Sequence, residues 1–187
     1  MTPETRDRLT RHYGYAKGAL KKLGPLSAAE RALLIGISRY LPGPVGAKRR
    51  AQDLAGPGND VASMRAVLKQ RYGYRDEDIC ELTDHQATRT GIFAALHAFL
   101  IAPTRVGDQL VFFYAGHGST APNPLSTEEN KLDETIVPSD ANLGVPDIHD
   151  KELAHLFNQA LDRGGKLVAT FDSCHSGSVT MTASPAQ

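Results

Sequence analysis

The sequence predicts one α/β domain whose parallel sheet is covered by helices on both faces. Short, continuous apolar segments, typical of strands buried on both faces, recur along the chain and alternate with stretches whose apolar residues have helical spacing. Strands and helices that alternate in this way are joined by right-handed crossovers in a parallel sheet. The chain has 187 residues, 41% of them hydrophobic, which suffices for a single domain with a substantial core.

The N-terminal region differs from the rest of the chain. Residues 3–23 are polar and basic, with a few scattered apolar side chains, and predict a loosely attached helix. We therefore expect a peripheral helical segment over residues 1–25 and a domain over residues 26–187.

The first half of the domain contains two predicted strands with a helix between them. Residues 31–38 are continuously apolar and predict the first strand. A long loop rich in glycine and proline follows, and Asn59 is then in position to cap a helix. The apolar segment at residues 78–82 predicts the second strand.

Three further strands and two helices complete the pattern. Thr88 predicts a helix cap, because the apolar side chains that follow it fall on one helical face. Residues 108–119 predict a third strand, residues 134–140 a fourth and residues 165–178 a fifth. Between the last two, Asp150 begins another helix.

Charge and cysteine content exclude several classes of protein. Lys and Arg total 21 residues, as do Asp and Glu, so the chain has no net field that would gather nucleic acid or an anionic membrane. No apolar run approaches the roughly 20 residues of a membrane span, and the start lacks the apolar core of a secretory signal. We expect a cytoplasmic protein without nucleic-acid or membrane partners. The two cysteines are too few for a disulfide framework, and Cys80, in an apolar strand, predicts a buried structural thiol.

Two polar peptides follow buried strands and form the candidate site. His117 lies between two glycines after the third predicted strand, and Cys174 follows the apolar run that ends at Asp172. The carboxyl ends of parallel strands meet at one rim of the sheet, where active sites of open α/β sheets lie. An imidazole there can take a thiol proton and later return it to a leaving amine. The N–H groups of Gly118 and Cys174 can face a developing oxyanion, and we expect the flanking glycines to leave room for a substrate backbone.

With these motifs the chain resembles the caspase-fold cysteine peptidases, and among them the metacaspases and their bacterial relatives, the orthocaspases. The matching motifs, in family order over roughly residues 31–180, are ALLIGIS, GPGNDVASM, FFYAGHGS, LDETIVPSD, IHDKEL and FDSCHSGS. The resemblance implies a caspase-like three-layer α/β/α fold with a mostly parallel sheet. It also implies a cysteine endopeptidase that cleaves after Arg or Lys, with His117 as general base and acid and Cys174 as nucleophile.

The resemblance also assigns a substrate pocket. The acidic residues that line the family's first specificity pocket match Asp60 and Asp172, and two carboxylates there would hold a guanidinium and repel an acidic side chain. Each carboxylate also has an alternative role: Asp60 would favour the start of its helix through the helix dipole, and Asp172 would end its strand or cap the next turn. Pro57 replaces a usual pocket cysteine and Ala115 a frequent serine, which leaves the choice between Arg and Lys open.

Many metacaspases need calcium, and the resemblance bears on this as well. Asp140 and Asp150 match acidic positions of the calcium site, whereas His149 and Met181 stand where two further carboxylates are expected. Because Ca²⁺ takes about six to eight oxygen ligands, the resemblance implies weak calcium dependence or none, and no required cofactor.

Family members continue with a small C-terminal subunit, so the resemblance implies such a partner in addition to peptide substrates. Two alternatives stay open: a non-catalytic caspase-like scaffold or regulatory domain, and a peptidase with a different preference for the residue before the scissile bond. The basic triplet at residues 48–50 is a candidate site of self-cleavage.

Overall fold

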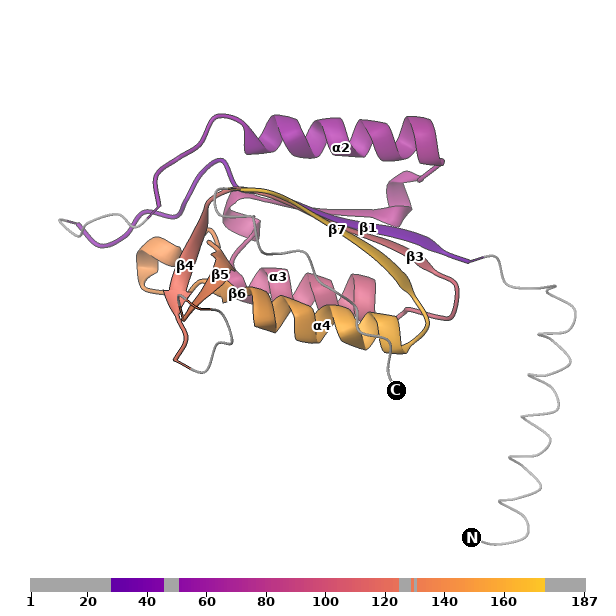
Figure 1. Cartoon of the computed structure of the whole chain (residues 1–187). Coiled ribbons are helices and arrows are strands. Elements are labelled where there is room, and N and C mark those ends of the chain that lie inside the picture. The colour runs from indigo at the N-terminus through magenta and orange to yellow at the C-terminus, as the bar shows by residue number, and fades with distance from the viewer. Residues whose placement is uncertain (1–27, 46–50, 125–128, 130, 174–187) are drawn as a thin grey trace, which may run out of the picture.

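A parallel sheet forms the centre of the chain. The computed structural model describes residues 28–45, 51–124, 129 and 131–173 (Figure 1). Within these residues four parallel strands pair in the order β2-β1-β3-β7. Their bounds are β1 Glu30–Gly36, β2 Ile79–Thr83, β3 Gln109–Ala115 and β7 Lys166–Asp172.

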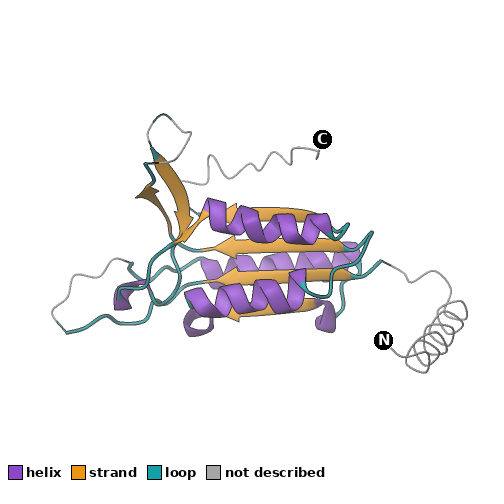
Figure 2. Ribbon diagram, turned by 90° about the horizontal axis from the view of Figure 1, so that it is seen from below, coloured by secondary structure: helices purple, strands orange, loops and turns teal. Residues whose placement is uncertain are grey.

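Helices cover both faces of this sheet, as predicted. Helix α2 (Pro57–Tyr72) lies on one face, and α3 (Arg89–Ala95) and α4 (Asp150–Asp162) lie on the other (Figures 1 and 2). A π-helical turn, η3 (Leu96–Ile101), continues α3. The side chains of residues 32–35 in β1 belong alternately to the core clusters on the two faces and have no exposed area, so this part of the strand is buried on both sides. Short 3₁₀ turns complete the described elements: η1 Asp76–Asp78, η2 Asp84–Gln86 and η4 Ala141–Leu143.

A second, smaller sheet projects from the carboxyl end of the first. Its strands β4 (Gly118–Pro122), β5 (Leu132–Ile136) and β6 (Ile148–His149) are antiparallel and pair in the order β4-β5-β6 (Figure 2). Two predictions are corrected by this sheet. The strand predicted over residues 108–119 ends at Ala115, and the strand predicted over residues 134–140 ends at Ile136 and belongs to the small sheet. Pro138, which has no N–H to donate, follows it closely.

Two of the three predicted helix starts are confirmed. Helix α3 begins after Thr88, whose hydroxyl accepts the N–H of Gly91 at 3.0 Å, and α4 begins at Asp150. The prediction that Asn59 caps a helix is wrong, because α2 already begins at Pro57. Proline suits the first turn of a helix, where its missing N–H would have no partner and its φ is already helical.

The remaining predictions fall partly outside the described residues. The peripheral helix over residues 1–25 and the basic triplet at 48–50 lie there. The fifth predicted strand, over residues 165–178, is β7, and it ends at Asp172. Cys80 is half-buried and packs against the larger core cluster, and burial raises the pKa of its thiol. None of the described helices is both long and apolar enough to cross a membrane.

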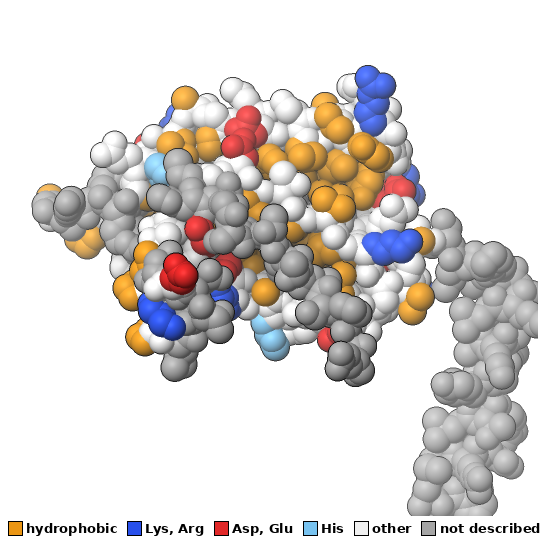
Figure 3. Space-filling model, in the orientation of Figure 1, with side chains coloured by type: hydrophobic (Ala, Val, Ile, Leu, Met, Phe, Trp, Pro, Cys, Tyr) orange, Lys and Arg blue, Asp and Glu red, His pale blue; other side chains and the backbone are white. Residues whose placement is uncertain are grey.

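Strand β7 is an edge of the parallel sheet within the described chain. Its residues alternate between partly buried and exposed, and the apolar ones on the partly buried side pack against the core beside α4. Val168 is 62% exposed on the other side, where α2 covers β1 and β3. Hydrophobic side chains are accordingly visible on this surface, below α2 (Figure 3).

Candidate functional site

The ends of β3 and β7 lie side by side, as the sequence predicts. The two strands are paired along their whole length, and Ala115 is opposite Asp172. Pairing extends one residue further, because the N–H of Gly116 donates to the carbonyl of Asp172 at 3.2 Å. His117 follows directly. Ser173 is the last described residue of the other strand, and Cys174 lies outside the described residues.

The imidazole of His117 is held by a backbone carbonyl. Its Nε2 atom lies 2.9 Å from the carbonyl oxygen of Gln52, which comes from the loop before α2. A carbonyl can only accept a hydrogen bond, so in the neutral ring Nε2 carries the proton and Nδ1 keeps the lone pair. The ring is thereby set in the tautomer that has Nδ1 as its proton acceptor.

Two tyrosines fix the backbone of His117. The hydroxyl of Tyr40 accepts the His117 N–H at 2.9 Å, and the two rings lie with their centroids 5.2 Å apart. The hydroxyl of Tyr114 lies 2.8 Å from the His117 carbonyl oxygen and 3.0 Å from that of Val137. Burial raises the pKa of both phenols, so both hydroxyls keep their protons at neutral pH.

The same two tyrosines explain why the residue before His117 is a glycine. A Cβ atom on Gly116 would lie 2.6 Å from the Tyr114 hydroxyl and 3.2 Å from that of Tyr40. Gly116 is itself buried. The expectation that this glycine makes room for a substrate is therefore wrong: it makes room for the two hydroxyls that hold the histidine.

The glycine after His117 starts the small sheet with its N–H turned outward. Hydrogen-bonded pairs alternate with non-hydrogen-bonded pairs along an antiparallel ladder. The N–H of Val137 donates to the carbonyl of His117 at 3.0 Å, which makes this pair the hydrogen-bonded one. Gly118 and Ile136 form the next pair, so the N–H of Gly118 faces away from β5.

The two predicted pocket carboxylates lie at the same rim and on the same face of the sheet. Alternation along β7 turns the exposed side chain of Asp172 toward the face that carries α2. Asp60 lies in the first turn of α2, and this turn packs on Gly36, where an added Cβ would lie 2.7 Å from Val61. Ala115, assigned to the same pocket, is fully buried beneath α2, so it supports this surface from below.

The two predicted calcium ligands have separate partners. Asp140 accepts the backbone N–H of Arg89 at 3.0 Å, whereas Asp150 lies 2.7 Å from the ammonium group of Lys151. In the described part of the chain no three metal-binding side chains are grouped to hold an ion.

Lys151 also reaches a buried carboxylate on β5. Its Nζ lies 3.1 Å from Oδ1 of Asp133, which is 2% exposed, and His149 Nδ1 lies 3.1 Å from the other oxygen. Burial opposes ionisation of Asp133, but hydrogen bonds from His149, Lys151 and Asn123 outweigh it and lower the pKa of the carboxyl. An ammonium group therefore bridges Asp133 and Asp150 and joins α4 to the small sheet.

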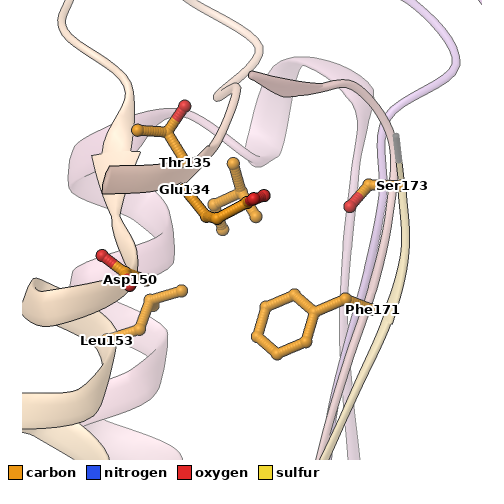
Figure 4. Close-up of a pocket in the computed structure, with 7 residues that line it drawn as sticks. Glu134, Thr135, Asp150, Leu153, Phe171 and Ser173 are labelled. Atoms are coloured by element: carbon orange, nitrogen blue, oxygen red, sulfur yellow. The ribbon is translucent and has the colours of Figure 1, made fainter. Parts of the chain in front are cut away.

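A small pocket lies beside the end of β7. It is lined by residues of β5, α4 and β7. Figure 4 shows the side chains of Glu134 and Ser173 pointing toward each other across it, with the ring of Phe171 below. One residue that lines this pocket, Ser173, therefore directly precedes the expected nucleophile in the sequence.

Several functional contacts were missed from the sequence. The Gln52 carbonyl belongs to the backbone and has no residue signature, and it lies 65 positions from His117. Tyr40 stands in the loop after β1, where an aromatic residue gives no indication of its partner. A signal did exist at Gly116, because a glycine at the end of a buried strand indicates a close neighbour.

Comparisons with known proteins agree with this arrangement. A family model described as "Metacaspase, peptidase C14 domain" matches residues 30–182. Metacaspase-1A of Aspergillus niger is 33% identical over 182 residues, which cover 94% of this chain and 43% of the relative. Metacaspase-1 of Coccidioides immitis is 36% identical over 173 residues, which cover 89% of this chain and 35% of the relative.

A solved structure is similar as well. A protein from Geobacter sulfurreducens, known from a crystal structure, superposes with a TM-score of 0.58 at 26% sequence identity. The match covers 81% of this chain and 52% of that one. The chain spans less than half the length of the two fungal relatives, at 43% and 35%.

Proposed function

Because this chain belongs to the metacaspase family of peptidase C14 domains, we propose that it supplies the catalytic residues of a cysteine endopeptidase. The observation that carries the proposal is the bond between His117 Nε2 and the Gln52 carbonyl at 2.9 Å. It sets the histidine as a base with Nδ1 as its acceptor, beside the strand that leads to Cys174. In the sequence, Cys174 comes two residues after Asp172, the last residue of β7.

In the proposed reaction Nδ1 of His117 takes the thiol proton of Cys174, and the thiolate attacks the carbonyl carbon of the scissile bond. The tetrahedral intermediate collapses to a thioester when the amine leaves with the proton from the imidazolium. Water then gives its proton to Nδ1, attacks the thioester and releases the acid and the thiol. The outward N–H of Gly118, together with the N–H of Cys174, stabilises the oxyanion in both steps.

For the substrate we propose a basic residue before the scissile bond. Asp60 and Asp172 supply two carboxylates on the α2 face of the same rim, which suits a guanidinium or ammonium group. Three peptide reporters that differ only in having Arg, Lys or Asp at this position test the preference through their cleavage rates. Faster cleavage after Asp would contradict it and favour the alternative specificity.

The proposed activity predicts covalent capture at one residue. We expect an arginine chloromethylketone to alkylate Cys174 in the wild type, as peptide mass mapping would locate. Cys174→Ala should abolish capture, and His117→Ala should slow it by about 10²–10⁴-fold, because the thiolate then forms without its base. A Cys80→Ser variant is the matched control and should react like the wild type. Absence of capture in the wild type would favour a non-catalytic scaffold.

We further propose that the chain has weak calcium dependence or none. The Lys151 ammonium lies within 3.1 Å of Asp133 and 2.7 Å of Asp150, so it already neutralises carboxylates that would attract a divalent ion. Peptidase rate should therefore change less than about twofold between excess EGTA and millimolar calcium.

The Lys151→Met variant tests whether this ammonium group is what excludes calcium. It leaves the Asp133 and Asp150 carboxylates without their positively charged partner, so calcium should bind more tightly and raise the midpoint temperature of thermal unfolding. Isothermal titration with calcium measures the difference. An absolute calcium requirement in the wild type would contradict the proposal.

A small C-terminal subunit is the partner that we propose for the β7 edge. Relatives extend well beyond the matched region, and β7 offers the exposed apolar side chain of Val168 and an unpaired edge in the described chain. A longer chain that carries this region should protect the amides of β7 from hydrogen exchange. Unchanged exchange there would contradict this docking site.

A further inference from the structure

The Gln52 carbonyl that holds His117 lies in a segment without regular secondary structure. No strand ladder orients it, and Gln52 itself is exposed. The chain is anchored just beyond it, because the N–H of Leu54 donates to the Ser38 carbonyl at 2.8 Å. On the near side the anchor is Ala51, which is 2% exposed. Asp53, the residue after Gln52, is held as well, because its carboxylate accepts the N–H of Tyr40 at 3.0 Å. The direction of the Gln52 carbonyl therefore depends on these far-side anchors and, on the near side, on what holds Ala51.

Ala51 is held by a single side chain, that of Asn142. The Ala51 N–H donates to Asn142 Oδ1 at 2.9 Å, and Asn142 Nδ2 donates to the Ala51 carbonyl at 2.9 Å. The same Nδ2 donates to the carbonyl of Leu41 at 3.2 Å. One carboxamide thus satisfies both backbone groups of Ala51 and ties them to the chain that leaves β1.

The orientation of this carboxamide is determined by its partners. With Oδ1 and Nδ2 exchanged, an NH₂ group would face the Ala51 N–H, and an oxygen would face two carbonyls. Only the observed orientation pairs donors with acceptors. Asn142 is 8% exposed, so water does not readily replace these bonds.

Asn142 is itself fixed in place. It belongs to η4, which follows Ser139, and the Ser139 carbonyl accepts the N–H of Leu41 at 2.8 Å. On the other side the chain passes so close that a Cβ on Gly43 would lie 2.6 Å from the Asn142 carbonyl oxygen. The side chain therefore holds Ala51 from a rigid support.

We propose that Asn142 is a positioning residue for the catalytic imidazole, acting through Ala51 and the Gln52 carbonyl. The inference rests on the proposed function, in which Nδ1 of His117 accepts the thiol proton. Without the carboxamide, Ala51 loses the partners of its buried N–H and C=O, and the next peptide turns to find others. Gln52 then no longer holds Nε2–H, and the ring samples other orientations and the second tautomer.

Nitrogen-15 NMR of the histidine rings tests this in the whole chain, without any substrate. The wild type should give one sharp set of His117 signals, that of the Nε2–H tautomer. In Asn142→Ala we expect signals averaged over both tautomers, like those of a free histidine side chain. In a peptidase assay the same variant should lose about tenfold or more in kcat, with KM within about twofold of the wild type. Wild-type tautomer signals in Asn142→Ala would overturn the proposal.

Thr104→Val is the matched control. It removes a bond from a buried side chain to the backbone, between Thr104 and the Leu100 carbonyl, but at the amino ends of β3 and β7. It should lower stability by about 1–3 kcal/mol and leave the His117 signals unchanged. Altered His117 signals in this control would attribute the effect to general loosening and overturn the proposal.

Two measurements on the wild type keep the outcomes distinct if Asn142→Ala does not fold. The Ala51 amide should exchange with solvent as slowly as the amides of β1, because both are buried and hydrogen-bonded. Fast exchange there would contradict the role of Asn142. A wild type without peptidase activity but with the Nε2–H tautomer and a protected Ala51 would contradict the proposed function and leave the positioning role standing.

Discussion

The ends of β3 and β7 are neighbours at one rim, yet they are supported very differently. At the end of β3 the ring, N–H and carbonyl of His117 all have partners, on Gln52, Tyr40 and Tyr114. At the end of β7 the strand has a neighbour on one side within the described chain, and its α2-side face is exposed. The described residues alone therefore orient the proposed base, whereas the strand that leads to the proposed nucleophile is open on one edge and one face.

This difference indicates where the site is vulnerable. Substitutions around His117 should disturb an arrangement that is already complete, at a cost in both stability and catalysis. Substitutions on the exposed face of β7 before Asp172 should change the stability little until another segment covers that face.

Gly116→Ala should have the largest effect. The new methyl group would lie 2.6 Å from the hydroxyl of Tyr114, which is fully buried and cannot move aside. We expect a loss of about 1–3 kcal/mol in unfolding free energy and about 100-fold in kcat/KM, because His117 is displaced. Gly58→Ala is the control, since its nearest contact is an ordinary 3.5 Å from Ser38. Equal activities in the two variants would mean that the tyrosines do not fix the histidine.

Tyr40→Phe should have a smaller effect on the same region. It keeps the ring beside His117 but removes the hydroxyl that accepts the His117 N–H at 2.9 Å. An unpaired buried donor costs about 1–3 kcal/mol, and we expect a fall of about tenfold in kcat. Tyr72→Phe, at a 64% exposed position, is the control. Urea unfolding and steady-state kinetics measure the two quantities, and a Tyr40→Phe enzyme with wild-type kcat would contradict the assignment.

The smallest effect is expected on β7. Val168, on the α2-side face of β7, is 62% exposed, whereas Val61 of α2 is 2% exposed where the helix packs on the sheet, so the two valines compare an uncovered position with a covered one. Val61→Ala should cost about 2 kcal/mol of unfolding free energy. Val168→Ala should change it by less than about 0.5 kcal/mol. Similar costs at both positions would show that β7 is covered in this chain and would remove the contrast between the two strand ends.

The sequence predicted those features that depend on local signals. The buried parallel strands, the Thr88 cap and the helix that begins at Asp150 each have a short-range pattern, and the structure confirms all three. The adjacency of β3 and β7 was predicted as well, since parallel strands must end at a common rim. Asn59 was misassigned because a good capping residue outweighed a proline two positions earlier.

The contacts that orient His117 had no comparable signal. Gln52 contributes a carbonyl, which every residue possesses, and Asn142 lies 91 positions from the Ala51 that it holds. The split between β3 and β4 was missed because the apolar and small residues of 108–119 continue through the turn. Only the tertiary arrangement reveals that two sheets meet there.

His117 stands at the junction of these two sheets: β3 ends two residues before it, and β4 begins one residue after it. A tilt of β4 relative to the end of β3 changes the backbone torsions of the two residues between them, Gly116 and His117. The NMR frequencies of the His117 ring should therefore report how the small sheet is oriented relative to the large one, even in the protein without substrate. They should also change when a molecule binds the small sheet away from the site.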